Sequence, residues 1–499
     1  MTAGLTEPLA LEDAEASTRH FPVLDLSARR TPVMEESADA TGAPAFDSTV
    51  SGARAPQLHS PSTEVHAFEL GRRETASPAE SSTQGVARRS GGALPRPELS
   101  SRPPERMDLQ LGQPHDSRAN VDDDVSSGAA DSVRSLVAAE IAAARELPTK
   151  KAIYQLRSPG KRKQLIEVLG GSEDTESAVE EALDWLAASQ SKNGRWDVDG
   201  FEGAEQCGGR GNQADADVGI TGFTLLAFLG AGYTHVDGKH KRSVKAAIDW
   251  IISGMKPNGD LRRGGQMYDQ AMATTALCEA ISLTGDSRLL PVAKRAVQFI
   301  LDAQNPGAAW RYNPREDNDT SVTGWQILAL KSAELAGIAI PQKHYRWTQM
   351  WLDQVRSGEE GGLYLYRAGH AVTPVMTAEG WFCQLFMGEQ AKTRGQQEST
   401  DYVMQHLPVW SLEVPGAINF YYWYYATLSL HLSGSDSFGL WNDALTTALL
   451  KGRVTEGPAA GTWDPVSHVG VRGGRIYSTA VATLCLEVYY RFLPFYKIK

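Results

Sequence analysis

Apolar and polar positions over residues 173–499 follow a helical period, and two kinds of segment alternate along the chain. One kind carries Lys, Arg or Asp on one face and apolar residues on the other, as in 243–252 and 291–301. The other kind is apolar almost all round and has small residues near its start. Because a helix that is apolar on every side must be buried on every side, this pattern predicts outer helices alternating with inner ones.

Six inner segments follow one another, and strand signals are sparse. The inner segments cover residues 218–229, 268–283, 321–336, 376–387, 420–432 and 477–492. Outer-then-inner pairs of this kind predict an all-α domain over 173–499, with a ring of inner helices inside a ring of outer ones, an α6/α6 toroid. An open superhelical stack of helix pairs is the alternative, and it would keep a more solvated face on both helix rows.

A short unit recurs after the outer segments, and its most complete copy is residues 182–196. There, Gln190 continues an apolar helix face, Gly194 ends the helix, and Trp196 follows. Glycine suits this end because it tolerates the left-handed conformation that terminates many helices. We expect the Trp196 indole and the Gln190 amide to bind carbonyl groups at the helix end. Later ring positions recur about every 50 residues, with one gap of double length, at Leu261, Trp310, Tyr364 and Trp463.

The first 130 residues differ in composition from the rest of the chain. All 12 Trp lie in 185–463 and no Tyr precedes Tyr154, whereas residues 1–130 are rich in Ser, Ala, Pro, Glu and Arg. Such a segment buries too little apolar surface to offset its conformational entropy, so we expect a disordered low-complexity tail, either a solvated linker or a partner-binding arm. Residues 131–172 begin with an amphipathic pattern over 131–146 and are expected to form a helical lead-in.

Charge and cysteine content limit the compartment and the partners. The net charge of −11 argues against nucleic acid as a partner. The acidic start lacks the apolar region of a signal peptide, and no run reaches the ~18 apolar residues of a membrane span. Four widely spaced cysteines without a C-x-x-C pair suit a reducing compartment, so a cytoplasmic location is expected.

The spacing of Trp, Leu, Gln, Gly and Trp in WLAASQSKNGRW (185–196) resembles the QW motif of the squalene cyclases, and 299–310 resembles a second copy. The β subunits of protein prenyltransferases have the same α/α toroid. The resemblance covers about 325 residues, from 173 to 499. It implies the terpenoid cyclase fold, a hydrophobic isoprenoid or lipid ligand in an aromatic-lined central cavity, and peripheral contact with a membrane. No cofactor is expected.

Class II members of that superfamily share a D-x-D-D-T-[AS] signature whose central acid protonates an alkene or epoxide, and 316–321 (EDNDTS) is similar to it. Glu316 stands at the first acid, and Asn318 stands at the central one, where an amide cannot donate a proton. The resemblance therefore implies Asp319 as the candidate catalytic acid, with Asp317 and Glu316 in support. The alternative is that Asp319 only caps the helix that follows.

Two further acids open inner segments. Asp217 precedes the first inner segment and Asp269 opens the second. Because the N-termini of inner helices gather at one end of a toroid, these two acids and Asp319 are expected to face one mouth. They are either three helix caps or a carboxylate cluster with raised pKa values that binds a cation. No D-D-x-x-D, D-x-C or C-G-E-Q motif occurs, so no zinc site or thioester is expected.

Aromatic residues are frequent in the inner segments. Their ring faces would line an isoprenoid cavity and stabilise a carbocation, or they serve as ordinary packing between helix rows. The candidate cavity residues are Trp325, Trp381, Phe382, Tyr421, Tyr422, Tyr425 and Tyr477. Two functions stay open at this point. One is an isoprenoid or triterpenoid cyclase-like enzyme that uses Asp319, and the other is a non-catalytic toroid that binds lipid or protein.

Overall fold

The computed structural model describes residue 157 and residues 170–388 and 393–491. The tail predicted over 1–130 and nearly all of the lead-in predicted over 131–172 lie outside the described residues. The inner helices are α6 (Asp217–Gly230), α8 (Met267–Thr284), α10 (Thr320–Leu335), α12 (Pro374–Met387), α14 (Phe420–Ser433) and α16 (His468–Leu486). The outer helices are α4 (Glu173–Ala188), α7 (Lys241–Ser253), α9 (Leu290–Ala303), α11 (Gln342–Gln354), α13 (Arg394–Met404) and α15 (Phe438–Gly452).

Short elements complete the described part of the chain. Helix α5 (Ala204–Cys207) and the 3-10 helix η2 (Ala214–Ala216) lie in the loop before α6, and α17 (Val488–Arg491) follows α16. Strands β1 (Arg356–Ser357) and β2 (Leu363–Tyr364) pair as an antiparallel hairpin after α11.

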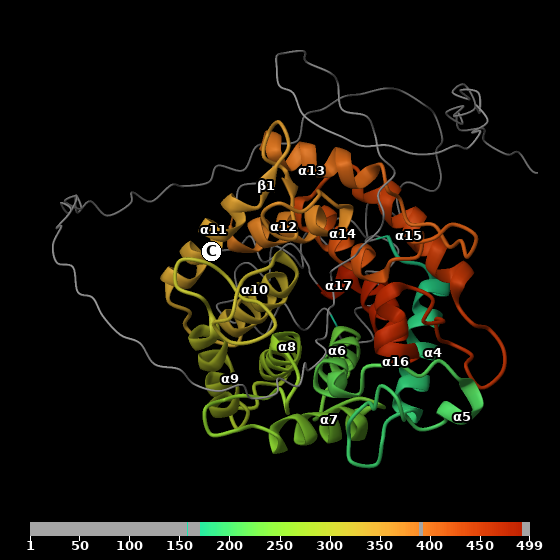
Figure 1. Ribbon diagram of the computed structural model, residues 1–499. Coiled ribbons are helices and arrows are strands. Elements are labelled where there is room, and N and C mark those ends of the chain that lie inside the picture. Colours follow the sequence, from blue (N-terminus) through green and yellow to red (C-terminus); the bar gives the residue numbers. More distant parts are fainter. Residues whose placement is uncertain (1–156, 158–169, 389–392, 492–499) are drawn as a thin grey trace, which may run out of the picture. The chain divides into compact units, whose positions relative to one another are not determined.

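The inner helices form a closed ring. Each packs against the next in chain order from α6 to α16, and α16 packs back against α6. The outer helices surround this ring: α7 packs on α6, α9 on α8, α13 on α12, α15 on α14, and α4 on α16 (Figure 1). Closure through α16 and α6 confirms the predicted α/α toroid and rules out the open stack as the arrangement of these helices.

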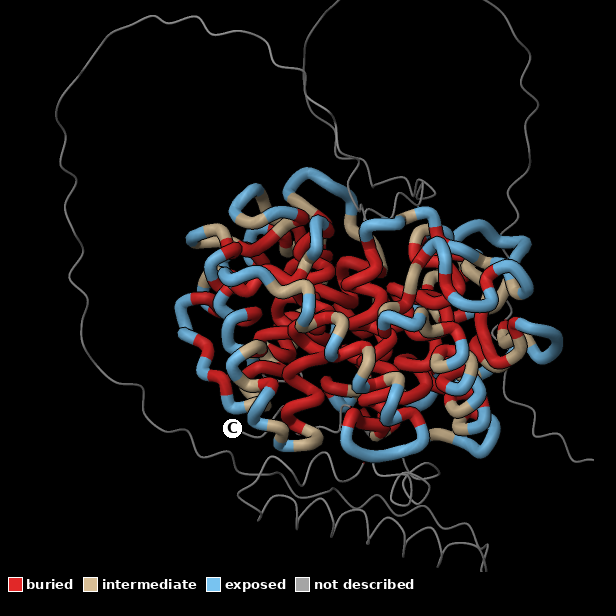
Figure 2. Tube along the Cα trace, turned by 90° about the horizontal axis from the view of Figure 1, so that it is seen from below, coloured by how far each residue is buried: buried red, intermediate tan, exposed pale blue. Residues whose placement is uncertain are grey.

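Burial follows the two kinds of sequence pattern. Every residue of α6 is buried, as the wholly apolar segment predicts. Helix α7 buries only the stripe Val244, Ala247, Ile248 and Ile251, and its charged side chains face outward. Figure 2 shows the same division along the chain, with buried stretches in the interior and exposed ones at the periphery.

The tryptophan of the repeated unit makes the same contact in three copies. The Trp196 indole N–H donates to the carbonyl of Leu186 at 2.7 Å. Trp310 donates to Ile300 O at 2.8 Å, and Trp463 donates to Leu449 O at 2.7 Å. Each indole therefore binds a carbonyl in the outer helix of its own unit, as expected for Trp196.

The glutamine of the unit joins one outer helix to the next. Gln190 Nε2 donates to Gly194 O at 2.8 Å in its own turn and to Ser243 O in α7 at 3.0 Å. Gly194 has φ +98°, and a Cβ there would lie 2.3 Å from Ala246 O, also in α7. Glycine is therefore required both for the turn and for the close approach of the neighbouring helix.

The second unit has no glutamine at this position, and an inner helix supplies one instead. Gln270 of α8 donates to Gly259 O in the turn and to Ala296 O in α9, both at 3.0 Å. The two acceptors correspond to those of Gln190, although Gln270 comes from the following inner helix. The ring thus keeps this link between outer helices even where the short motif is incomplete.

The last inner helix differs from its predicted bounds. Helix α16 begins at His468, nine residues before the predicted start at 477, and it contains a kink at Gly474, where φ is +71°. A Cβ at Gly474 would lie 2.5 Å from the backbone nitrogen of Gly211, so the loop before α6 packs tightly on the kink. No helix among the described residues has both the length and the apolar content needed to cross a membrane.

Candidate functional site

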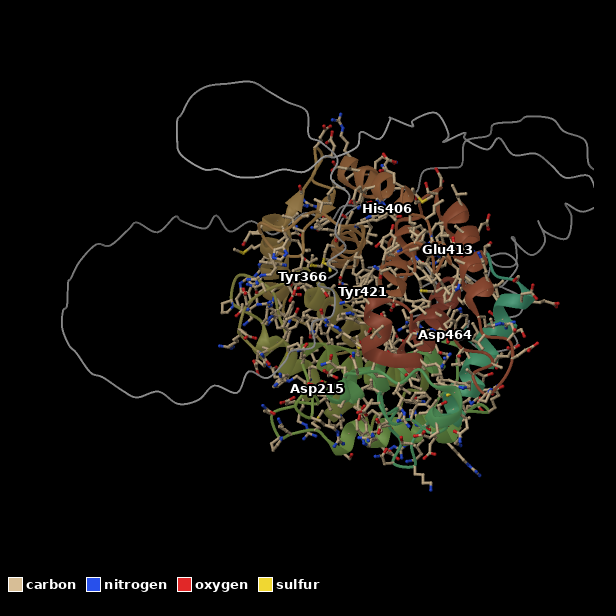
Figure 3. The ribbon with its side chains drawn as sticks, turned by 45° about the vertical axis from the view of Figure 1, so that its right-hand side comes forward. Asp215, Tyr366, His406, Glu413, Tyr421 and Asp464 are labelled. Atoms are coloured by element: carbon tan, nitrogen blue, oxygen red, sulfur yellow. The ribbon has the colours of Figure 1, made fainter. Side chains whose placement is uncertain are left out.

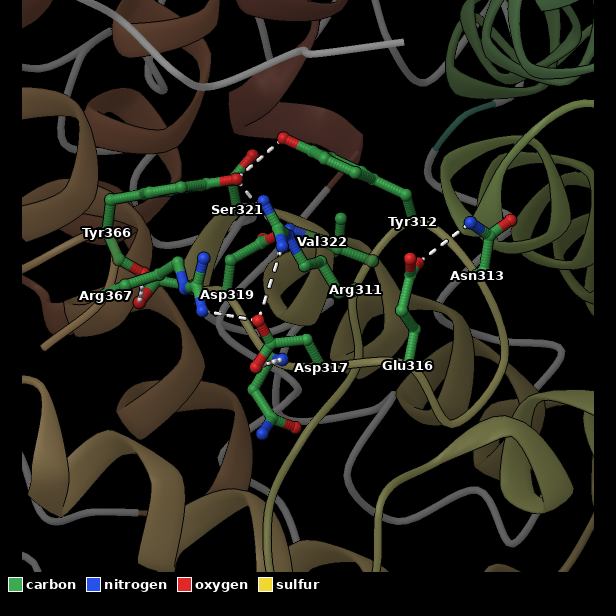
Figure 4. A network of polar contacts seen from close by, with 12 residues as sticks. Arg311, Tyr312, Asn313, Glu316, Asp317, Asp319, Ser321, Val322, Tyr366 and Arg367 are labelled. Atoms are coloured by element: carbon green, nitrogen blue, oxygen red, sulfur yellow. Dashed lines mark hydrogen bonds and ion pairs between the residues drawn. The ribbon is translucent and has the colours of Figure 1, made fainter. Parts of the chain in front are cut away.

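Asp319 is fully buried at the start of α10. Its Oδ1 accepts the backbone N–H of Val322 at 2.7 Å, and its Oδ2 accepts the hydroxyl of Tyr366 at 3.1 Å (Figure 4). Burial raises its pKa to about 7, because desolvation outweighs these hydrogen bonds and the nearby charge of Arg311. Asp319 is therefore both a helix cap and an acid whose pKa is raised into the neutral range.

Arginine and tyrosine side chains close the site around Asp319. Arg311 Nε lies 3.6 Å from Asp319 Oδ2, and its guanidinium lies 4.9 Å from the ring centroid of Tyr312. The hydroxyls of Tyr312 and Tyr366 are 2.6 Å apart. Arg311 is about a quarter exposed, so Asp319 lies one side chain away from solvent.

The other acids of the 316–321 stretch are less buried than Asp319. Asp317 forms ion pairs with Arg311 and with Arg367, and it is half-buried. Glu316 is exposed and accepts a hydrogen bond from the Asn313 side chain at 2.8 Å. Of the three acids in this stretch, only Asp319 is buried within the ring.

Asn318, at the position of the central acid, serves the turn of the preceding unit. Its Oδ1 accepts the backbone N–H of Ala309 at 2.9 Å and the Asn305 side-chain amide at 3.0 Å. These partners hold the amide in the turn between α9 and α10. The Asn318 side chain therefore stabilises this turn. An aspartate at this position would stabilise it only by accepting hydrogen bonds from the same two donors.

Asp217 and Asp269 each link consecutive elements. Asp269 Oδ1 accepts Gly219 N of α6 at 2.7 Å, and its Oδ2 accepts Gln266 N at 2.8 Å. Asp217 Oδ1 accepts Val198 N at 3.0 Å. Burial raises the pKa of Asp269 to about 7 and that of Asp217 to about 6.

The structure does not bring the three aspartates together as a metal site. The charges that act most on the pKa of Asp217 are Arg195, Asp197 and Asp199, all in its own preceding loop. Within residues 157, 170–388 and 393–491, no group of three or more His, Cys, Asp or Glu side chains is placed to hold a metal ion. Asp269 completes the capping box at the start of α8 by accepting Gln266 N. Asp217 accepts Val198 N in the preceding loop and does not cap α6, whose start has no side-chain cap. The functional role of both acids stays a prediction.

Glu379, on α12, is a buried acid that the motif search missed. Both of its oxygens lie 3.1 Å from the hydroxyl of Tyr421, which in turn lies 3.2 Å from Ser321 Oγ. Ser321 also pairs with the Tyr268 hydroxyl at 2.5 Å. Burial raises the pKa of Glu379 well above its ordinary value and so favours the protonated acid. Figure 3 shows Tyr421 toward the middle of the ring.

A small residue on the facing helix makes room for Glu379. A Cβ on Gly324 of α10 would lie 2.1 Å from Glu379 Oε1. Gly324 belongs to the small residues that mark the start of an inner segment, and Glu379 is the only charged residue in α12. A lone acid inside an otherwise uncharged inner segment was therefore the sequence signal for this site.

Three aromatic rings meet across the interior of the ring of helices. Phe223 of α6 lies 5.3 Å from Trp325 of α10 and 6.0 Å from Tyr424 of α14, measured between ring centroids. Trp325 stacks on Tyr424 at 5.7 Å with an interplanar angle of 8°. Because these rings come from alternate inner helices, side chains fill the interior at this level.

The predicted cavity residues fall into two groups. Tyr425 contacts Trp325 at 5.6 Å, and Tyr477 stacks on Phe223 at 5.8 Å, so these two rings and Tyr421 belong to the interior. Phe382 adjoins them through an edge contact to Tyr425 at 5.2 Å.

The other two rings face the outer row. The Tyr422 hydroxyl donates to Val403 O in α13 at 2.9 Å, and its ring lies edge-on to Trp441 of α15. Trp381 lines a separate pocket of about 220 Å³ beside the hairpin and α13. The inner-helix assignment was thus sufficient to place these residues in the core, but not to say which side of the helix they occupy.

A second pocket, of about 230 Å³, lies where α14 and α16 begin. Its apolar lining comes from Leu412, Val414, Ile418, Val466 and Val469. Its polar lining includes the helix-capping residues, whose side chains accept N–H groups of the first turns: Asn419 for α14 and Ser467 for α16. We call this the 412–469 pocket.

No protein-family model matches the chain, and no curated protein matches it. Solved structures with a similar arrangement of helices include the α-1,6-mannanase of Salegentibacter sp. HEL1_6, at 11% identity and a TM-score of 0.46, covering 63% of this chain and 98% of that one. A type II terpene cyclase from Scytonema, in complex with geranylgeranyl dihydroxybenzoate, is similar at 13% identity and a TM-score of 0.44, covering 64% and 97%.

An unsaturated glucuronyl hydrolase from Bacillus sp. GL1 is similar at 14% identity and a TM-score of 0.45, covering 65% of this chain and 98% of that one. These proteins act on unrelated substrates, and likenesses at such scores carry no argument about chemistry. The function must therefore be argued from the side chains of this chain.

Proposed function

We propose that this chain is a non-catalytic toroid that binds a short isoprenoid or similar lipid, and that the ligand enters the 412–469 pocket rather than the middle of the ring. The observation that carries the proposal is the clustering of exposed apolar side chains. Five of the eight large apolar residues that are exposed in the described part lie on or beside the loops that form this pocket: Val409, Leu412, Val414, Val466 and Val471.

Such a cluster is costly in water and is a mark of an interaction site in a folded protein. Leu412 is 72% exposed and Val414 is 58% exposed, and both line the pocket. Ile418 and Val469 are buried beneath them. The pocket therefore has an apolar wall and floor that a hydrocarbon chain would cover.

The polar side of the pocket suits a head group that bears oxygen. Asn419 and Ser467 mark the N-termini of α14 and α16, which carry partial positive charge from the aligned peptide dipoles. A hydroxyl or an anionic head group would be favoured there. The volume of about 230 Å³ lies below the usual ~300–1,000 Å³ of small-molecule sites and fits a short chain better than a triterpene.

The filled interior supports a ligand site outside the middle of the ring. Phe223, Trp325 and Tyr424 contact one another where a central cavity would lie. A substrate could occupy this level of the interior only by displacing these rings.

The test uses the purified full chain with farnesol and, separately, with squalene. Bound lipid and any product are extracted and measured by mass spectrometry, and the Kd for farnesol is measured by titration. We expect Leu412→Asp to weaken farnesol binding by at least roughly tenfold, because a carboxylate would have to be buried against the hydrocarbon of farnesol. Leu440→Asp is the matched control, since Leu440 is 60% exposed but lies outside the pocket.

A cyclase is the second candidate, and Glu379 is the observation that favours it. A buried carboxylic acid with a raised pKa, bonded to Tyr421 whose ring adjoins Trp325, is the kind of group that protonates a polyene. In the same assay, a cyclised product that disappears in Glu379→Gln or Asp319→Asn would establish this candidate. Binding that is lost in Trp325→Ala but kept in Leu412→Asp would also overturn the pocket proposal.

A further inference from the structure

The opposite end of the inner helices holds a buried arginine from outside the toroid. Arg157 lies in the stretch before α4, yet it is only 2% exposed. Its partners come from three elements near the end of α6, on α8 and on α17. No motif in the sequence pointed to this residue.

The guanidinium of Arg157 is bound on several sides. Nη1 donates to Glu279 Oε2 at 2.9 Å and to Leu229 O at 3.3 Å, and Nη2 donates to Arg491 O at 2.7 Å. One carboxylate and two backbone carbonyls therefore receive it. A planar guanidinium has N–H donors in a fixed arrangement that reaches several acceptors at once. The ammonium group of lysine lacks this arrangement.

Glu279 holds two guanidinium groups at once. Its second oxygen, Oε1, accepts Nη2 of Arg491 at 2.8 Å, and Arg491 Nη1 donates to the Tyr424 hydroxyl at 3.3 Å. Burial alone would raise the pKa of Glu279, but the charges of Arg491 and Arg157 outweigh burial and hold that pKa below its ordinary value. The acid is thus ionised in the interior, and the network reaches Tyr424 of the central ring cluster.

The main chain of the toroid also accommodates this arginine. Gly232, just after α6, has φ +87°, and a Cβ there would lie 2.1 Å from the carbonyl oxygen of Arg157. The absence of a side chain at Gly232 lets the backbone at residue 157 approach. The carbonyl of Leu229 belongs to the last turn of α6, where the helix dipole favours a cation.

We infer that Glu279, Leu229 O and Arg491 O form a guanidinium-binding site at this end of the toroid, and that its ligand is the chain's own Arg157. The site binds residue 157 to α6, α8 and α17 through a single side chain. It is independent of the 412–469 pocket and of any chemistry at Asp319 or Glu379.

The inference is tested by chemical rescue in the full chain. Arg157→Ala should lower the Tm by roughly 5–10 °C, since it leaves Glu279 with one of its two buried partners. Millimolar ethylguanidinium chloride should restore part of the Tm in a saturable way, whereas equal sodium chloride should not. The Tm of Arg157→Lys should remain below that of wild type, because an ammonium group cannot reproduce the arrangement of donors in a guanidinium.

Two controls make the result specific. The double variant Arg157→Ala with Glu279→Gln should show no rescue, because the carboxylate that receives the guanidinium is gone. Arg394→Ala, which removes an arginine with an 85% exposed side chain, should respond to ethylguanidinium as wild type does.

The opposite results would overturn the site. They are a Tm for Arg157→Ala within experimental error of wild type, or an equal response of Arg157→Ala and Arg394→Ala to the probe. If Arg157→Ala does not fold alone, its refolding yield with and without ethylguanidinium decides, and equal yields reject the site.

Discussion

Glu279 and Glu379 are alike in sequence context, but their pKa values are shifted in opposite directions. Both lie on inner helices, α8 and α12, and both are at most 1% exposed. The pKa of Glu279 is lowered, because two guanidinium groups outweigh the effect of burial. The pKa of Glu379 is raised well above its ordinary value, because burial outweighs the hydrogen bonds from Tyr421 and Tyr425 and the charge of Asp319 adds to the effect. For these two glutamates, the direction of the pKa shift follows whether arginine side chains bind the carboxylate.

The largest expected effect comes from neutralising the ionised member of the pair. Glu279→Gln should lower the free energy of unfolding by about 3–5 kcal/mol, because Arg157 and Arg491 would keep their buried charges without the carboxylate. Urea unfolding of the full chain at neutral pH measures this. A loss below about 1 kcal/mol would contradict the ionised state assigned to Glu279.

A smaller effect should appear in the pH dependence of stability. The pKa of Asp319 is raised from 3.8 to about 7, so the folded state holds the proton more tightly than the unfolded state does. The stability from this group is complete below the unfolded pKa and is lost as pH rises through about 7. Between pH 5 and 7 the loss should be about 2 kcal/mol.

Asp319→Asn should flatten this part of the pH profile, since Asn keeps the capping oxygen but has no proton to lose. Asp269, with a pKa also raised to about 7, contributes a slope of the same sign and should remain in the variant. Glu279 has the opposite sign: its lowered pKa stabilises the fold above the unfolded pKa and is lost at acid pH. An unchanged slope in Asp319→Asn would refute the raised pKa.

The smallest effect is expected at Glu379. Glu379→Gln should change the free energy of unfolding at pH 7 by less than about 1 kcal/mol, because an amide oxygen can still accept from Tyr421 and the raised pKa favours the uncharged form of the acid, which an amide resembles. It is the matched control for Glu279→Gln, with the same chemical change on another inner helix. A larger loss than that of Glu279→Gln would reverse the comparison.

Local features of the fold were predictable because they depend on neighbours in the chain. The contact from Trp196 to Leu186 O spans one turn and one helix end, so the short motif predicted it. The division into inner and outer helices followed from how many faces of each segment are apolar. The second unit lacks the glutamine, so the motif is less complete there. Gln270, from an inner helix, makes the same link between outer helices.

The sequence by itself determined the helices, their division into two rows and the repeated turn, because these depend on periodicity and on contacts a few residues apart. Only the tertiary structure decided that the ring closes, that Trp325 and Tyr424 fill its interior, and which acids are charged. Arg157 binds a carbonyl 334 residues away, and Ser321 meets Tyr421 across 100 residues. The burial of a side chain and the charge of its partners depend on such distant contacts, which a local sequence pattern does not reveal.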